Sequence, residues 1–99
     1  MGVLRRRRTR SPHMNNVFTA YVLYSKQFDN IYIGQTGNIK ERLLNHNLGL
    51  VKSTKAFRPW KLIYSELFST RAEAMRREKW LKSGVGREFI KTYRRENNI

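Results

Sequence analysis

Two β-rich runs separated by a short polar turn constrain the fold of this 99-residue chain most strongly. Residues 17–25 read VFTAYVLYS and residues 31–35 read IYIGQ, and both are rich in β-branched and aromatic side chains. Because Asp29 and Asn30 supply a turn signal at hairpin distance, the sequence predicts an antiparallel pair of strands. A chain this short holds one core, so the other elements must pack on this pair.

A helix and a third strand are expected after the hairpin. Asn38 with Glu41 three residues later resembles a capping box, which predicts a helix over about residues 38–48. A basic, turn-rich connection then leads through Pro59 into WKLIYSELF at residues 60–68. The β-branched and aromatic content of this run predicts the third strand.

Helices are expected over the last third of the chain. Thr70 with Glu73 repeats the capping pattern and predicts a second helix that ends by Ser83-Gly84. In residues 86–99, apolar side chains at helical intervals predict a third helix. The order ββαβαα therefore predicts an α+β domain in which a small three-stranded antiparallel sheet is flanked by helices.

Residues 1–14 differ from the rest, because MGVLRRRRTRSPHM carries five arginines and no acid. This segment is expected to be either a native disordered basic arm or a leader left from cloning, and the leader is favoured. The folded domain is expected to span residues 15–99. Without those five arginines the chain keeps 16 basic against 7 acidic residues, a net charge of +9.

The charge of the whole chain, +14, favours a polyanionic partner, and nucleic acid is the first candidate. A membrane partner is disfavoured because the chain has neither an apolar run long enough to span a bilayer nor an uninterrupted basic amphipathic helix. With no cysteine and only two histidines, a structural zinc site of the usual kind cannot form. No signal sequence opens the chain, so a cytoplasmic location is the default expectation.

Charged side chains interrupt the predicted inward faces of two helices. The first helix places four residues on one face: Ile39, Arg42, Leu43 and His46. The second helix has a similar stripe: Ala74, Met75, Glu78 and Leu81. Since an unpaired buried charge costs several kcal/mol, Arg42 and Glu78 each need a partner. That partner is a metal, a substrate, or each other in a purely structural ion pair with His46 nearby, and the residues alone leave this open.

The strand residues give weaker signals. Tyr21 and Tyr32 project from the predicted sheet, where paired tyrosines are usually ordinary packing. Gly34 weakens its strand but lets a backbone or a ligand approach closely, as a phosphate-binding surface requires.

The triplet Tyr32-Ile33-Gly34 and the spacing around it resemble the GIY-YIG nuclease superfamily, most closely its small stand-alone bacterial members, over about residues 17–91. By this resemblance the catalytic positions fall on five residues: Tyr21, Tyr32, Arg42, His46 and Glu78. The first triplet departs from Gly-Ile-Tyr, because it reads Thr19-Ala20-Tyr21, but it keeps the tyrosine. The asparagine that some members carry after the glutamate is assigned to no residue.

The resemblance implies a DNA endonuclease that hydrolyses phosphodiester bonds with Mg²⁺, or with Mn²⁺ in its place. Glu78 would hold the metal, and Arg42 would grip the scissile phosphate. Tyr21 would deprotonate the attacking water, helped by positive neighbours or by His46 as proton acceptor, while Tyr32 would orient the water or the phosphate.

Contacts to the DNA backbone, with little sequence specificity, are expected from six residues: Gly34, Lys52, Lys55, Arg58, Arg76 and Arg77. A monomer is expected, and so is a structure-selective role in DNA repair, recombination or processing. The chief alternative is a non-catalytic nucleic-acid-binding module of the same fold. A third is a basic ribosome-associated or interaction protein, which leaves the Tyr, Arg, His and Glu set unexplained.

Overall fold

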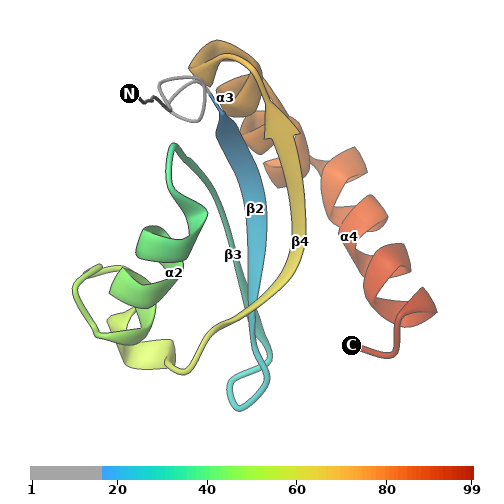
Figure 1. The fold of residues 1–99 in the computed structure, drawn as a ribbon. Helices are drawn as coiled ribbons and strands as arrows, with labels where there is room; N and C mark the ends of the chain where they lie inside the picture. The colour runs from blue at the N-terminus through green and yellow to red at the C-terminus, as the bar shows by residue number, and fades with distance from the viewer. Residues whose placement is uncertain (1–16) are drawn as a thin grey trace, which may run out of the picture.

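The computed structural model describes residues 17–99 and confirms the predicted ββαβαα order and α+β class (Figure 1). The described elements are β2 (Phe18–Ser25), β3 (Asn30–Thr36), α2 (Ile39–Asn47), the short 3₁₀ helix η2 (Lys55–Phe57), β4 (Lys61–Phe68), α3 (Arg71–Lys82) and α4 (Gly84–Glu96). The expectation for residues 1–14 lies outside the described residues.

The sheet has the strand order β3-β2-β4, and both pairings are antiparallel. Strand β2 is central, and four consecutive side chains from Ala20 to Leu23 are at most 1% exposed. A strand covered on both faces has no solvent side, which explains why the run VFTAYVLYS shows no alternation of apolar and polar residues.

Two hydrophobic clusters cover the two faces of the sheet. One lies between the sheet and helices α3 and α4, and its buried residues are Ala20, Val22, Ile33, Ile63, Leu81 and Ile90. The other lies on the α2 side, where Tyr21, Leu23 and Trp60 pack with partly buried Tyr32, Ile39, Leu43, Phe57 and Leu62. In Figure 1 helix α2 and helix α4 accordingly lie on opposite sides of the strands. Alternation along β2 therefore directs Tyr21 to the α2 side.

The caps of the helices are those that the sequence predicts. The Asn38 side chain accepts a hydrogen bond from the Glu41 backbone N–H at 3.1 Å, and Thr70 Oγ1 accepts one from the Glu73 N–H at 3.2 Å. The third helix begins at Gly84, two residues earlier than expected, because Ser83 both ends α3 and caps α4. The helix η2 in the basic connection is an element that the sequence did not predict.

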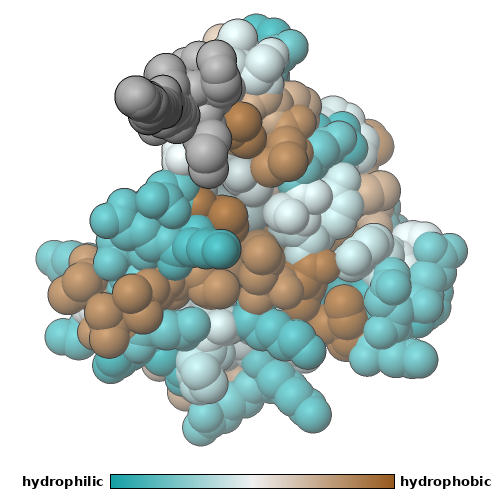
Figure 2. Space-filling model, in the orientation of Figure 1, coloured by the Kyte–Doolittle hydropathy of each residue, from teal (hydrophilic) through white to brown (hydrophobic). Residues whose placement is uncertain are grey.

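The predicted inward stripe of the second helix is wrong at one position. Ala74 and Leu81 are fully buried, but the Met75 side chain is 52% exposed, since its place on the helix turns it away from the sheet. Figure 2 shows further apolar side chains at the surface, and Leu44, Leu48 and Leu50 at the end of α2 are among those exposed. No helix within residues 17–99 is long and apolar enough to cross a membrane.

Candidate active site

The ring of Tyr21 lies across strand β3 at Gly34. The two residues are register partners, and Tyr21 is only 1% exposed. A Cβ at position 34 would lie 2.7 Å from the Tyr21 hydroxyl and 2.8 Å from Cζ, closer than any Cβ can approach. Gly34 permits a close approach, as its position in the strand predicts. The group that approaches is the Tyr21 phenol. Gly34 is therefore not open to a DNA phosphate.

A chain of buried hydrogen bonds continues from the Tyr21 hydroxyl. The hydroxyl lies 3.1 Å from His46 Nε2, and His46 Nδ1 lies 2.7 Å from Thr54 Oγ1. Thr54 Oγ1 in turn donates to the carbonyl of Val51 at 3.3 Å. Because the single hydroxyl proton of Thr54 is used in that bond, His46 must donate through Nδ1 and accept through Nε2. The imidazole is thus oriented to take a proton from Tyr21.

Thr54 is the residue of this site that the sequence reasoning missed. It lies in the connection between α2 and β4, is 1% exposed, and its backbone carbonyl accepts a hydrogen bond from Trp60 Nε1 at 2.9 Å. A threonine in a basic, turn-rich segment carries no signal that distinguishes it from a surface residue. Only the packing of this connection against α2 brings it to His46.

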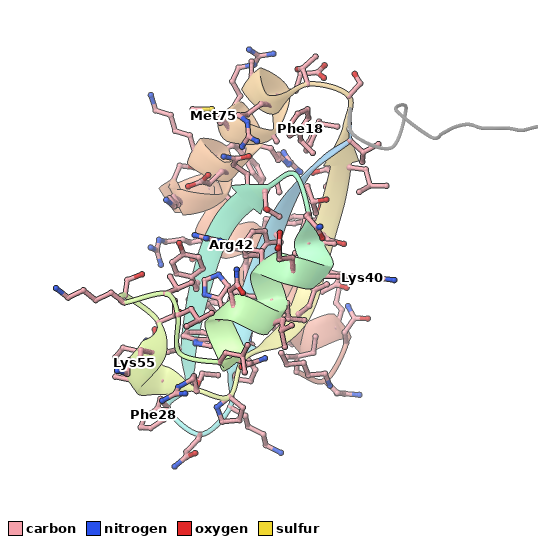
Figure 3. The ribbon with its side chains drawn as sticks, turned by 60° about the vertical axis from the view of Figure 1, so that its left-hand side comes forward. Phe18, Phe28, Lys40, Arg42, Lys55 and Met75 are labelled. Atoms are coloured by element: carbon pink, nitrogen blue, oxygen red, sulfur yellow. The ribbon has the colours of Figure 1, made fainter. Side chains whose placement is uncertain are left out.

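Arg42 lies on the side of α2 that faces strand β3 (Figure 3). Hydrogen bonding to the Tyr21 side chain is the largest of the causes that raise the pKa of the Arg42 guanidinium, and Tyr32 adds to it. The Tyr32 ring also lies against the imidazole, with its centroid 4.9 Å from that of His46. The structure therefore brings Tyr21, Tyr32, Arg42 and His46 into one cluster beneath α2.

Burial controls the protonation of this cluster. Burial raises the pKa of Tyr21. The hydrogen bond from Arg42 lowers this pKa, whereas the charge of Glu78 raises it slightly further. Burial also lowers the pKa of His46, with the positive charge of Arg42 as the second cause. A neutral phenol beside a neutral imidazole is the expected state near neutral pH. Tyr21 can accept a proton from water only while it passes its own proton to His46.

Glu78 lies on α3, and its negative charge is a minor cause of the raised pKa of Tyr21. Its side chain is 23% exposed and is not sealed in the interior. The structural ion pair with Arg42 is not formed. Instead, the Lys82 ammonium lies 2.6 Å from Glu78 Oε2, one helical turn further along α3.

The donor set around Glu78 fits a hard divalent cation that keeps most of its waters. Within residues 17–99 no three His, Cys, Asp or Glu side chains gather into a metal site. Glu78 Oε2 is bonded to Lys82, and Oε1 has no hydrogen-bond partner in the described part of the chain. One partly exposed carboxylate is the kind of ligand through which proteins commonly bind Mg²⁺, with substrate phosphate supplying others.

The basic residues predicted to contact DNA fall in two groups. Lys52, Lys55 and Arg58 line one cavity beside the end of α2, and Arg76 is exposed on α3. Arg77 is different, because its Nε lies 2.7 Å from Glu66 Oε1 and its guanidinium sits over the Trp80 ring at 4.1 Å. The Arg77 side chain is therefore engaged by Glu66 and Trp80. The geometry gives no support to its predicted contact with DNA.

Comparison with known proteins assigns this chain to a family. A family model described as the GIY-YIG catalytic domain matches residues 17–97. That match covers all the described secondary structure and every residue of the predicted catalytic set. The fold is that of a GIY-YIG catalytic domain, the domain of a family of nucleases.

Related bacterial proteins narrow the assignment further. A UPF0213 protein of Staphylococcus haemolyticus is 46% identical over 73 residues, covering 72% of this chain and 89% of the relative. A UPF0213 protein of Bacillus licheniformis is 44% identical over 80 residues, covering 77% and 81%. The chain belongs to the GIY-YIG family and, within it, to the UPF0213 proteins. A solution NMR structure of a UPF0213 protein from Bacillus halodurans is 28% identical, with a TM-score of 0.47 and coverage of 77% of this chain and 83% of that one.

Proposed function

We propose that this protein is a Mg²⁺-dependent DNA endonuclease that hydrolyses phosphodiester bonds, with Mn²⁺ as an alternative metal. One observation carries the proposal: the buried Tyr21 hydroxyl lies 3.1 Å from His46 Nε2, and Arg42 lies beside the same phenol. In this proposal His46 is the base, Arg42 is the phosphate-binding cation, and Glu78, whose charge contributes to the raised pKa of Tyr21, is the metal ligand. Phosphodiester hydrolysis needs each of these groups.

Arg42 would bind the scissile phosphate. Its planar fork of donors matches two phosphate oxygens, and a charged phosphate is a stronger acceptor than the neutral phenols that Arg42 now contacts. Turning from the phenols to the phosphate would uncover the Tyr21 hydroxyl, which is otherwise buried. The guanidinium would then stabilise the negative charge that grows in the transition state.

Tyr21 and His46 would activate the attacking water together. As the water attacks phosphorus, its proton passes to the Tyr21 oxygen and the Tyr21 proton passes to His46 Nε2. The imidazolium that results has a lowered pKa, so it returns its proton readily once the strand is cut. Tyr32, partly buried beside His46, would orient the water or the phosphate by hydrogen bonding.

Glu78 would hold the metal through its partly exposed carboxylate, after sharing or exchanging its contact with Lys82. When bound, Mg²⁺ would supply positive charge that neutralises the phosphate and stabilises the leaving oxygen. Lys52, Lys55, Arg58 and Arg76 would contact the DNA backbone without reading bases. Structure-selective cleavage in repair, recombination or processing, a cytoplasmic location and a monomeric state stay predictions.

The test is nicking of supercoiled plasmid with Mg²⁺ by the wild type and by Glu78→Gln. We expect the variant to lose cleavage while its DNA affinity, measured without divalent metal, stays close to that of the wild type. Glu88→Gln is the matched control, because Glu88 lies on the exposed side of α4, where it pairs with Lys91. Cleavage by Glu78→Gln at the wild-type rate would exclude the proposed role of this carboxylate.

The alternative, a binding module without activity, makes the opposite prediction for the wild type. A protein that binds supercoiled, branched and single-stranded DNA but cuts none of them with Mg²⁺ or Mn²⁺ would establish that alternative.

A further inference from the structure

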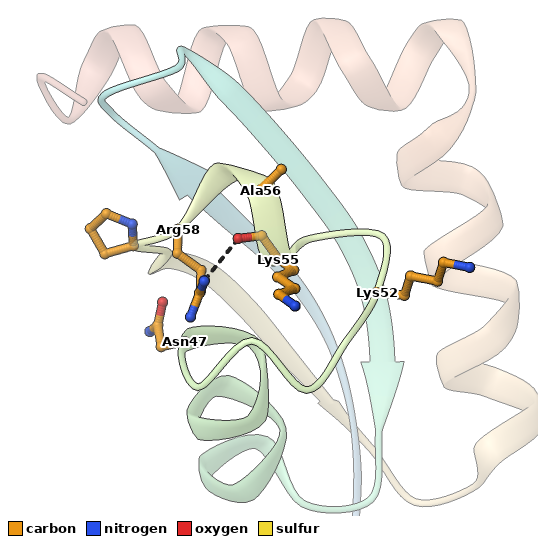
Figure 4. Close-up of a pocket in the computed structure, with 6 residues that line it drawn as sticks. Asn47, Lys52, Lys55, Ala56 and Arg58 are labelled. Carbon is orange, nitrogen blue, oxygen red and sulfur yellow. Dashed lines mark hydrogen bonds between the residues drawn. The ribbon is translucent and has the colours of Figure 1, made fainter.

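A basic cavity lies beside the candidate active site, on the connection between α2 and β4. Its volume is about 630 Å³ and its lining contains no acid: Asn47, Lys52, Lys55, Ala56, Arg58 and Pro59. Figure 4 shows Lys55 and Arg58 side by side above Asn47, whereas the Lys52 side chain points away from them. The charge of the cavity therefore comes chiefly from one ammonium and one guanidinium.

The guanidinium of Arg58 is held in place by two features of the backbone. Its Nε donates a hydrogen bond to the Lys55 carbonyl at 2.8 Å. Gly49, at a left-handed φ of +79°, leaves room for it, because a Cβ there would lie 2.7 Å from Nη1 and 3.0 Å from Cζ. With Nε already bonded, the two terminal nitrogens still offer donors to a ligand. An arginine fixed before binding loses little entropy when it binds.

Asn47 makes the floor of the cavity rigid. Its Nδ2 donates to the Trp60 carbonyl at 3.0 Å, and its Oδ1 accepts from the Trp60 backbone N–H at 2.6 Å. Both ends of the amide are engaged in these bonds. The Asn47 side chain therefore supplies no counter-group to the two cations.

Lys55 and Arg58 are not neutralised by a neighbouring acid. Four cations make ion pairs: Arg77 with Glu66, Lys82 with Glu78, Lys91 with Glu88, and Arg94 with Asp29. Within residues 17–99 neither Lys55 nor Arg58 lies within ion-pair distance of an acid. Two neighbouring positive charges without a counter-charge form a site for an anion.

We infer that Lys55 and Arg58 bind a backbone phosphate of the DNA outside the scissile bond. This inference rests on the proposed function, because one DNA strand would occupy both the active site and the basic cavity. Asn47 follows Arg42 by five residues on α2, roughly 7.5 Å along the helix axis. One strand carries a phosphate about every 3.4 Å along the DNA axis, so a strand bound at Arg42 would present further phosphates to the cavity.

The inference assigns this connection two roles. Lys55 directly follows Thr54, the residue that orients His46, and Asn47 directly follows His46 itself. A phosphate bound by Lys55 and Arg58 would therefore steady the segment that supports the proton acceptor. The site would help to place the strand as well as to attract it.

The test is DNA affinity by fluorescence anisotropy, with a short labelled duplex in EDTA, as a function of NaCl. Arg58→Ala should lower affinity roughly tenfold and reduce the slope of log K against log salt by about 0.9. Arg58→Lys should restore the slope but only part of the affinity, since lysine keeps the charge and loses the fork. Arg95→Ala is the matched control, because Arg95 is exposed on α4, across the sheet from α2.

Equal changes in Arg58→Ala and Arg95→Ala would overturn the inference, because the cavity would then add only general charge. A second arm titrates inorganic phosphate against the Nε–Hε NMR signal of Arg58. A shift of that signal together with unchanged DNA affinity in Arg58→Ala would indicate a site for free phosphate and would also overturn it. Because binding is measured without metal, it does not depend on cleavage. A protein that never cuts DNA would refute the proposed function but would not change the outcome of this binding test.

Discussion

The Tyr21 phenol occupies the space that a side chain at position 34 would need, 2.7 Å from the Cβ that any residue but glycine would carry. Tyr21 reaches this position because β2 and β3 pair with Tyr21 opposite Gly34. The glycine is thus required by packing within the cluster, and the hydroxyl is held where His46 and Arg42 meet it.

Gly34→Ala should therefore disturb Tyr21 directly. Since the added methyl must displace a buried ring, we expect a loss of about 1–3 kcal/mol in the free energy of unfolding, measured by urea denaturation. Nicking activity should fall with it. Gly37→Ala is the control, because a Cβ there would meet nothing closer than 3.6 Å. Equal free energies of unfolding for the two variants would show that the Tyr21 ring can move aside without a loss of stability.

Arg42→Lys should lose most of its activity although the positive charge is kept. Lysine cannot offer two parallel donors to a phosphate, so we expect kcat to fall on the order of 10²-fold, as for loss of a group that stabilises the transition state. The measurement is single-turnover cleavage with saturating enzyme. Arg95→Lys is the control and should cleave like the wild type. A wild-type rate for Arg42→Lys would show that the mechanism does not need the two parallel donors of the guanidinium.

His46 should make the stability of the fold depend on pH. Burial lowers the pKa of His46 in the folded protein, so below about pH 6.5 the unfolded chain binds more protons than the folded one. Stability should then be fully present above that pH and decrease as pH falls toward the lowered pKa. Urea unfolding between about pH 5 and about pH 8 would measure this. His46→Gln should give a flatter profile, and identical profiles would assign the dependence to other groups.

Thr54 should fix the tautomer of His46. Thr54→Val keeps the shape of the side chain but removes the acceptor for Nδ1–H, so an unsatisfied buried donor should cost about 1–3 kcal/mol of stability. Imidazole ¹⁵N shifts should show that the population protonated at Nδ1 decreases. Thr54→Ser should keep the wild-type spectrum and activity. A wild-type spectrum in Thr54→Val would mean that another group holds the ring.

Short-range patterns predicted the elements well, because their causes lie a few residues apart. The capping residues Asn38 and Thr70 are where the sequence places them, and each helix follows from its cap. Met75 was expected on the buried stripe of α3 and is exposed. Helical spacing predicts which face of a helix is buried, but it does not predict how wide the buried stripe is. The five catalytic positions came from the family resemblance, and their catalytic roles stay predictions.

Pairings between side chains were less accessible from the sequence. The i, i+4 spacing of Glu78 and Lys82 is visible in it, yet an ion pair with Arg42 was an equally open choice. The pair of Arg77 and Glu66, on different elements, has no such local signal. Which acid meets which base depends on how α3 lies against the strands.

By itself the sequence determined the order of strands and helices, the basic character of the chain, and the positions where charge interrupts an apolar face. These properties depend on neighbours along the chain, through turn and cap chemistry and through periodicity. Tertiary packing decided that Tyr21 fills the space at Gly34, that Thr54 orients His46, and that Asn47 lies in one cavity with Arg58. Such contacts join residues whose distance is fixed only when the sheet and helices exclude water from the spaces between them.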